Sequence, residues 1–258
     1  MPDIVILGSG NVANHFAKAL KKAEINIKQI FGRNIETVSE LAKSINSSYT
    51  TNIADIVQDA DIYFFIMNDE ANISICNQIN IKPNCILAHT AGSQSIDIFK
   101  NKTPNYGVFY PFQTFTKSVE TDFSKVPICL EASNNETYLE FEKIAQKLNC
   151  KTFNLDASKR EIVHLSGVFA ANFMNHCVNI AEVILTENNI STDIIKPLLE
   201  QSFFKLLNNK AANSQTGPAI RNDNFTIEKH IELIKENKQY SEVYQVLTNS
   251  IKSKFKIK

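Results

Sequence analysis

The N-terminal stretch Ile4-Val-Ile-Leu-Gly8-Ser-Gly10-Asn-Val-Ala13 decides the fold class. Four apolar residues predict a buried strand, and a turn with two glycines joins it to an amphipathic helix. Gly8 permits the tight turn, Gly10 lets the backbone approach a phosphate, and Ala13 allows close packing of helix on strand. The pattern is typical of the first turn of a Rossmann domain, where the helix N-terminus attracts a dinucleotide pyrophosphate.

The turn therefore supplies most of the candidate cofactor-binding residues. A Rossmann-like scaffold without a cofactor is the alternative interpretation of the same pattern. A further candidate, Asn68, follows the apolar segment 61–67, which we expect to form another strand of the sheet. The candidates in and after these two strands are Gly8, Ser9, Gly10, Asn11, Val12, Ala13 and Asn68.

The end of the second expected strand, Phe31-Gly32-Arg33-Asn34, indicates which dinucleotide is bound. NAD-binding domains usually carry an acidic residue here for the ribose 2′-hydroxyl, whereas this chain has no carboxylate before Glu36. Arg33, with Asn34 beside it, could bind the 2′-phosphate of NADP. NADP is therefore favoured over NAD, and a solvated surface arginine is the alternative.

Strand-like and helix-like segments alternate over residues 1–156, which predicts an α/β Rossmann domain with a doubly wound, mainly parallel sheet. Residues 157–258 carry only helical patterns, beginning with an apolar stretch of about thirty residues from Ser158. We expect an all-helical C-terminal domain there, with Ser191 and Thr226 as N-caps of later helices. The first long helix is apolar on more than one side, which predicts burial against neighbouring helices or a second subunit.

Composition excludes several classes of protein. The formal net charge is zero, which argues against a generally basic nucleic-acid-binding surface. No uninterrupted apolar run reaches the roughly 18 residues of a membrane span, and the N-terminus does not resemble a signal peptide. The five cysteines form no Cys-x-x-Cys pair and the histidines lack metal-ligand spacing, so we expect a cytoplasmic protein with reduced thiols and no metal.

Four segments beyond the strand pattern resemble a known group of proteins. They are His89-Thr-Ala-Gly-Ser93, Tyr110-Pro-Phe-Gln-Thr-Phe115, His164-Leu-Ser-Gly-Val-Phe-Ala-Ala-Asn172, and Thr216-Gly-Pro-Ala-Ile-Arg221-Asn-Asp223. Together with the glycine turn they are similar to Rossmann-like proteins with a C-terminal DUF2520 domain. That family is distantly similar to pyrroline-5-carboxylate reductase, to F420-dependent NADP reductases and to the 6-phosphogluconate dehydrogenase superfamily.

The resemblance implies an NADP-binding domain followed by a helical domain that often builds a dimer, so a homodimer through the C-terminal helices is expected. It implies no particular substrate. The chain departs from many relatives at Tyr110-Pro111, where they have His-Pro. A phenol at this position can still donate a hydrogen bond.

His164 and Asn172 are the candidate catalytic residues. They lie eight residues apart, which on an α-helix corresponds to about 80° of rotation, so both could border one pocket. Histidine is suited to deliver a proton near neutral pH while hydride reaches carbon. A structural histidine is the alternative interpretation.

Two further groups are candidates for binding a small-molecule substrate. His89, Thr90 and Ser93 follow an apolar strand, and ligands bind beyond the carboxyl ends of parallel strands. In the loop between C-terminal helices, Arg221 could hold a carboxylate or phosphate and Asp223 could orient it, with Thr216 nearby. A loop that only caps a helix and an ion pair that only pins a loop are the respective alternatives.

The sequence thus predicts an NADP(H)-dependent oxidoreductase that moves hydride to or from a C=O or C=N centre of a small polar substrate. A non-catalytic NADP-binding or sensing module is the alternative from another class, favoured by the lack of an evident catalytic lysine. Within the enzyme class, imine reduction of the pyrroline-5-carboxylate type is the specific alternative. F420 stays open as a partner in hydride transfer.

Overall fold

The computed structural model describes residues 2–257, and contacts divide the chain into two compact units, Met1–Phe173 and Met174–Lys258. The predicted domain boundary at 156/157 falls at the start of helix α5 (Ala157–Gly167), whereas this division falls after Phe173. The first unit therefore contains both the sheet and the helix that carries His164.

The first unit is built on an eight-stranded sheet with the order β3-β2-β1-β4-β5-β6-β7-β8. Neighbours from β3 to β6 are parallel, β6 and β7 are antiparallel, and β7 and β8 are parallel again. The order 3-2-1-4-5-6 is that of the Rossmann sheet, which confirms the predicted fold class. The strands are β1 (Ile4–Leu7), β2 (Ile27–Phe31), β3 (Ser48–Thr50), β4 (Ile62–Phe65), β5 (Ile86–His89), β6 (Tyr106–Pro111), β7 (Ile128–Ala132) and β8 (Thr152–Asn154).

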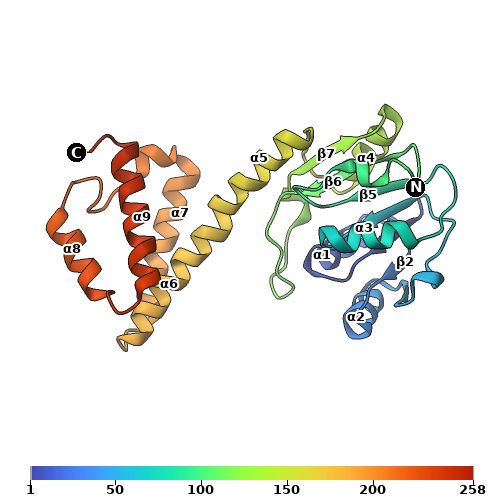
Figure 1. Ribbon diagram of the computed structural model, residues 1–258. Coiled ribbons are helices and arrows are strands. Elements are labelled where there is room, and N and C mark those ends of the chain that lie inside the picture. Colours follow the sequence, from blue (N-terminus) through green and yellow to red (C-terminus); the bar gives the residue numbers. More distant parts are fainter. Residues whose placement is uncertain (1, 258) are drawn as a thin grey trace. The chain divides into compact units, whose positions relative to one another are not determined.

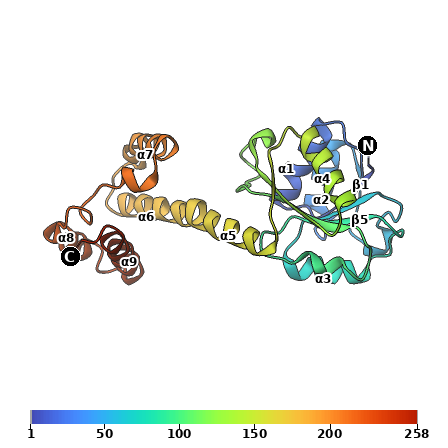
Figure 2. The same cartoon turned by 90° about the horizontal axis from the view of Figure 1, so that it is seen from above.

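Helices cover both faces of this sheet, and Figure 2 shows α1 and α4 on one face and α3 on the other. Ile4 and Ile6 of β1 belong to a core cluster with α1, α2 and α4, while Val5 and Leu7 belong to a second cluster with α3. This alternation follows from the two-residue period of a strand that is buried on both sides. The helices of this layer are α1 (Asn11–Lys22), α2 (Ile35–Ile45), α3 (Asp69–Gln78) and α4 (Asn135–Lys147), with short 3-10 turns η1 (Ile53–Asp55), η2 (Ile96–Phe99) and η3 (Phe123–Lys125).

The carboxyl ends of four parallel strands lie side by side along one edge of the sheet. Leu7 of β1 is paired with Phe65 of β4, which is paired with His89 of β5, which is paired with Val108 of β6. Neighbouring strands are about 4.8 Å apart, so the glycine turn after β1 and the loop after β5 are about 10 Å apart. The candidate cofactor and substrate residues of the first unit therefore share this edge.

Two local expectations differ from the structure. Strand β3 was not predicted, because Ser48-Tyr49-Thr50 at the edge of the sheet is exposed or half-buried and shows no apolar run. Thr226 was predicted to cap a helix, but the cap of α8 (Asn224–Leu233) is Asp223, whose carboxylate accepts hydrogen bonds from the Thr226 N–H and hydroxyl. Ser191 does cap the turn η5 (Thr192–Ile195), as predicted.

The long apolar helix is continuous over Ala157–Glu187, but its centre is a π-helical turn, η4 (Val168–Phe173). By length and composition alone this segment could cross a membrane, and none of its apolar window is buried. Core helices of soluble proteins meet the same two criteria. Of the residues of α5, only Arg160 is buried.

The second unit consists of helices, and Figure 1 shows α6 to α9 in it. In residues 174–257 only Ala219, Ile227 and Thr248 are buried, while large apolar side chains such as Phe204 and Leu207 are exposed. The unit has very little hydrophobic core of its own. Its helices are α6 (Met174–Glu187), α7 (Lys196–Asn208), α8 and α9 (Lys238–Lys254), with turns η5 and η6 (Ala211–Ser214).

Candidate active site

The glycine turn has the geometry of a pyrophosphate site. Gly8 has φ +139°, and a Cβ there would overlap the carbonyl of Ile66, so only glycine fits. Gly10 is the N-cap of α1, and a Cβ on it would meet nothing within 4 Å. No side chain caps this helix and no acidic residue lies in its first turn, so its free N–H groups and positive dipole end are available to an anion.

Arg33 and its neighbours lie at the start of α2, next to the glycine turn. Ser9 Oγ and Thr37 Oγ1 share a hydrogen bond of 2.8 Å, which links the turn to α2. Arg33 is exposed and has no ion-pair partner among residues 2–257, and Asn34 caps α2 by accepting a hydrogen bond from the Thr37 N–H. A free guanidinium at a helix N-terminus fits a phosphate, and the role of Arg33 stays a prediction.

Asn68 is the N-cap of α3, and its side chain accepts a hydrogen bond of 2.9 Å from the Ala71 N–H. Capping of α3 is a sufficient structural reason for an asparagine at this position. A contact between Asn68 and the cofactor stays a prediction.

His89 is fully buried at the end of β5 and holds the loop that follows. Its Nδ1 accepts a hydrogen bond of 3.1 Å from the Ala91 N–H, and its Nε2 makes no hydrogen bond to residues 2–257. Burial, together with the positive charge of Arg160, lowers the pKa of His89 to about 3, so the ring is neutral with its proton on Nε2. The placement favours a role in shaping the loop over direct contact with a substrate.

Three residues of this loop lie close to His89 in the sequence and differ in exposure. Thr90 is half-buried, Ser93 is exposed, and neither hydroxyl makes a hydrogen bond within the described chain. Gly92 packs against the ring of His164, since a Cβ on Gly92 would lie 2.7 Å from the His164 Nδ1. The structure thus brings the predicted loop and the predicted catalytic histidine into contact.

A hydrogen bond of 3.1 Å joins the Tyr110 hydroxyl at the end of β6 to His164 Nδ1. Burial raises the pKa of Tyr110 to about 12, so the phenol keeps its proton near neutral pH. A phenol that donates to Nδ1 leaves the ring proton on Nε2. His164 is an exposed residue, and its Nε2 makes no hydrogen bond to residues 2–257.

No hydrogen bond joins Asn172 to His164 in the described part of the chain. Asn172 is exposed and lies in the π-helical turn η4, which interrupts the α-helical periodicity used to estimate the angle between the two residues. Its proposed role beside His164 therefore has no support from a contact within the first unit.

The candidates of the C-terminal unit form a group of their own. Asp223 caps α8, and Arg221, which is mostly exposed, lies 4.0 Å from its carboxylate. Hydrogen bonds from Thr226 lower the pKa of Asp223, and the charge of Arg221 adds to the effect. Thr216 is exposed beside Gly217, whose φ of +108° requires glycine. Capping accounts for Asp223, while the role of Arg221 in substrate binding stays a prediction.

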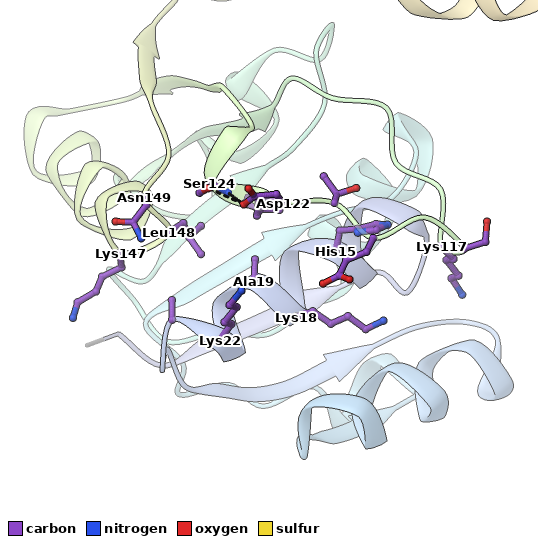
Figure 3. A pocket seen from close by; sticks show the side chains of 15 residues that line it. His15, Lys18, Ala19, Lys22, Lys117, Asp122, Ser124, Lys147, Leu148 and Asn149 are labelled. Carbon is purple, nitrogen blue, oxygen red and sulfur yellow. Dashed lines mark hydrogen bonds between the residues drawn. The ribbon is translucent and has the colours of Figure 1, made fainter. Parts of the chain in front are cut away.

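A hollow of about 970 Å³ lies elsewhere, between α1, the loop before η3 and the end of α4 (Figure 3). None of the predicted site residues lines it. Lys22 and Lys147 belong to the last turns of α1 and α4, where a positive charge offsets the helix dipole. Figure 3 shows Lys147 pointing away from Lys18 and Lys117, so these cations do not converge on one ligand.

No group of three or more His, Cys, Asp or Glu side chains that could hold a metal ion occurs among residues 2–257. The candidate site of the first unit therefore consists of the glycine turn, the 89–93 loop and the Tyr110–His164 pair.

Comparisons with known proteins show which family the chain is similar to. Residues 3–92 match a family described as NADP oxidoreductase, coenzyme F420-dependent, and residues 126–251 match a domain of unknown function, DUF2520. The crystal structure of BF3122 from Bacteroides fragilis, provisionally described as an NADP oxidoreductase, is 33% identical, covers 97% of both chains and has a TM-score of 0.94.

More distant structures share the fold. The 1-pyrroline-5-carboxylate reductase of Streptococcus pyogenes is 13% identical over 98% of both chains, with a TM-score of 0.65. A reductive aminase from Aspergillus terreus, solved with NADPH and ethyl-5-oxohexanoate, is 12% identical over 98% of this chain and 93% of its own, with a TM-score of 0.73. No curated protein matches the chain.

The buried, neutral His89 predicts an acid-sensitive fold. Its pKa is about 3 in the folded chain and about 6.5 in the unfolded chain, so below pH 6.5 only the unfolded state takes up this proton. The free energy of unfolding should fall by about 2 kcal/mol between pH 7.5 and pH 5 from this residue alone. Urea unfolding at several pH values measures it.

The matched variant is His89→Asn, whose side-chain oxygen can accept the Ala91 N–H bond but does not titrate. We expect its unfolding free energy to be lower at pH 7.5 but to depend less steeply on pH. Equal pH dependence in the two proteins would show that His89 is charged in the folded state or is not buried.

Proposed function

The chain belongs to the family of NADP oxidoreductases that carry a C-terminal DUF2520 domain, as the motifs predicted, and we propose that it transfers hydride between NADP(H) and a C=O or C=N carbon of a small polar substrate. Because the family consists of NADP oxidoreductases, the chain is an NADP-dependent oxidoreductase. The observation that carries the proposal is the Tyr110–His164 hydrogen bond at the edge of the sheet that also bears the glycine turn. In the proposed arrangement Tyr110 donates this hydrogen bond, and His164 Nε2 then carries a proton that can be given to a substrate.

The residues present fit the cofactor. The open space at Gly10 and the uncapped N-terminus of α1 would hold the pyrophosphate, and Arg33 with Ser9 and Thr37 would hold the 2′-phosphate. When bound, the reduced cofactor supplies the hydride.

His164 supplies the proton that the reduction requires. As carbon gains hydride, the substrate oxygen or nitrogen gains electron density and takes the proton from Nε2. Tyr110 donates its hydrogen bond to Nδ1, which keeps the ring in the tautomer that has a proton to give. In the same step the Tyr110 hydroxyl passes its proton to Nδ1, so the ring stays neutral, and the phenolate takes up a proton from water to restore the starting state. The product is an alcohol or an amine.

Two alternatives give different experimental outcomes. Imine reduction of the pyrroline-5-carboxylate type differs from carbonyl reduction only in the substrate that turns over. A non-catalytic NADP-binding module would bind the cofactor and turn over nothing. The free proton donor at His164 favours the enzyme, because a sensing module does not need one.

We further propose that the protein is a homodimer formed through its C-terminal unit. Residues 174–257 bury only three side chains and expose Leu198, Phe204 and Leu207, with exposed fractions of 65%, 63% and 86%. Exposed apolar surface of this extent in a soluble protein marks an interface. A second copy of the chain is the proposed partner, because a dimer through the helical domain is what the resemblance to DUF2520 proteins implies.

We propose a cytoplasmic location, because free thiols persist in a reducing compartment. All five cysteines are free, and three of them are buried. The chain shares its fold with an NADP oxidoreductase over 97% of its length, and core helices of soluble proteins can have the same length and composition as Ala157–Glu187, so we assign this segment to a protein interior or interface rather than to a membrane.

Removal of the Arg33 side chain should weaken the binding of NADPH but not the binding of NADH. We expect Arg33→Ala to raise the Kd for NADPH about 10- to 100-fold, because a charge-assisted contact with phosphate is lost, and to leave the Kd for NADH unchanged. Isothermal titration calorimetry gives both constants. Lys21→Ala, an exposed cation at the other end of α1, is the control. Equal effects on NADPH and NADH would remove Arg33 from the cofactor site.

Hydride transfer tests the proposed reaction. NADPH oxidation is followed at 340 nm with a panel of cyclic imines, keto acids and aldehydes, and the reverse reaction with hydroxy acids and with reduced F420. For the substrate that turns over, we expect His164→Gln to lower kcat about 10²- to 10⁴-fold and Tyr110→Phe about tenfold, with unchanged NADPH affinity. Tight NADPH binding without turnover of any substrate would favour the non-catalytic module.

The dimer is tested by light scattering coupled to size exclusion. We expect a mass twice the 29.1 kDa of the chain. The double variant Phe204→Asp/Leu207→Asp should be monomeric, because it places charges in the apolar surface. Val119→Asp, at an exposed apolar residue of the first unit, should stay dimeric. A monomeric wild-type protein at micromolar concentration would overturn the proposal.

A further inference from the structure

A fully buried arginine, Arg160, lies one helical turn before His164 and uses three of its nitrogens on three different partners. Its Nε donates to the Gly92 carbonyl at 3.2 Å, and its Nη2 donates to the Gln94 carbonyl at 2.7 Å. Its Nη1 forms an ion pair with the carboxylate of Glu131 on β7. The guanidinium therefore ties helix α5 to the sheet and to the loop after β5.

The same loop is held from its other side by α3. The Gln94 side chain is buried, its amide donates to the Asp69 carbonyl at 2.9 Å, and its carbonyl accepts from the Asn72 amide at 2.9 Å. The loop is thus fixed between α3 and Arg160, with little freedom to move relative to α5.

The fixed loop in turn confines the proton donor. The carbonyl of Gly92 is bound by Arg160, and the α-carbon of the same glycine lies against the His164 ring. Arg160 and His164 are four residues apart and lie on the same side of α5. The ring therefore lies against Gly92 and is hydrogen-bonded to Tyr110, and the position of Gly92 depends on Arg160.

Stability alone gives little reason for a charged pair at this place. A buried ion pair recovers little more than the cost of removing both charges from water, and apolar residues of similar size often serve as well. Three directed hydrogen bonds from one planar group do fix geometry, which apolar side chains cannot do.

We propose that Arg160, paired with Glu131, is a positioning residue that sets the His164 ring against Gly92 and Tyr110 and thereby keeps Nε2 as the proton-bearing nitrogen. The inference rests on the proposed function only for its effect on turnover. The placement and tautomer of the ring can be measured without a substrate.

Three variants test the proposal. Arg160→Lys keeps the charge but has one nitrogen, which cannot reach all three partners. Arg160→Met/Glu131→Leu replaces the whole ion pair by apolar groups, so that no unpaired charge is buried and the fold is retained. Lys159→Met, at the exposed neighbour that pairs with Asp156, is the matched control.

The first readout is NMR of ¹⁵N-labelled protein, with the His164 ring signals assigned from His164→Gln. In the wild type and in Lys159→Met we expect the Nε2–H tautomer and a nuclear Overhauser contact between His164 and the Gly92 α-protons. In both Arg160 variants, with cooperative unfolding retained, the contact should weaken and the tautomers should mix. Unchanged ring signals in either folded Arg160 variant would overturn the proposal.

The second readout compares the change in kcat with the change in the Kd for NADPH. We expect kcat to fall about 10- to 100-fold in both Arg160 variants, as a displacement of about 1 Å at the reacting groups can cause, while the Kd for NADPH stays unchanged. Unchanged kcat would overturn a positioning role. If the wild type turns over no substrate, the proposed function fails while the NMR result still decides the role of Arg160.

Discussion

The complete burial of β1 between β2 and β4 is the constraint on which the rest of the first unit depends. All four of its side chains are inaccessible to solvent, two on each face, so helices must cover the sheet on both sides. In a parallel sheet the strands beside β1 end at the same edge, and the turns that follow them become neighbours. The glycine turn, the 89–93 loop and Tyr110 come from distant parts of the sequence and meet there for this reason.

Much of this fold could be predicted, because local chemistry specifies it. The run Ile4–Leu7 is apolar throughout, and a Gly8 side chain would collide with the Ile66 carbonyl, so strand and turn are visible in the sequence. Strand β3 was missed because its pairing with β2 is made by backbone hydrogen bonds, which the exposed residues Ser48–Thr50 do not reveal.

The site could be predicted only in part. His164 and the loop after β5 were recognised as candidates from their motifs, but the Tyr110–His164 bond spans 54 residues and no local pattern encodes it. Arg160 and Glu131 were not recognised, since each looks like an ordinary surface charge in its own segment. A single arginine followed by Ile162-Val163 and a single glutamate within the apolar run of β7 are weak signals, and only the fold shows that they meet.

The near absence of a core in the second unit has a consequence for how the protein is maintained. A unit that buries three side chains cannot draw its stability from its own interior, so its free energy of unfolding depends on whatever covers its apolar helices. In the proposed homodimer a second copy of the chain is that cover, so the stability of the helices depends on protein concentration. Dilution then lowers their stability, and newly made chains expose apolar surface until they associate. The expression level then becomes a determinant of folding, and unpaired chains become substrates for chaperones and proteases.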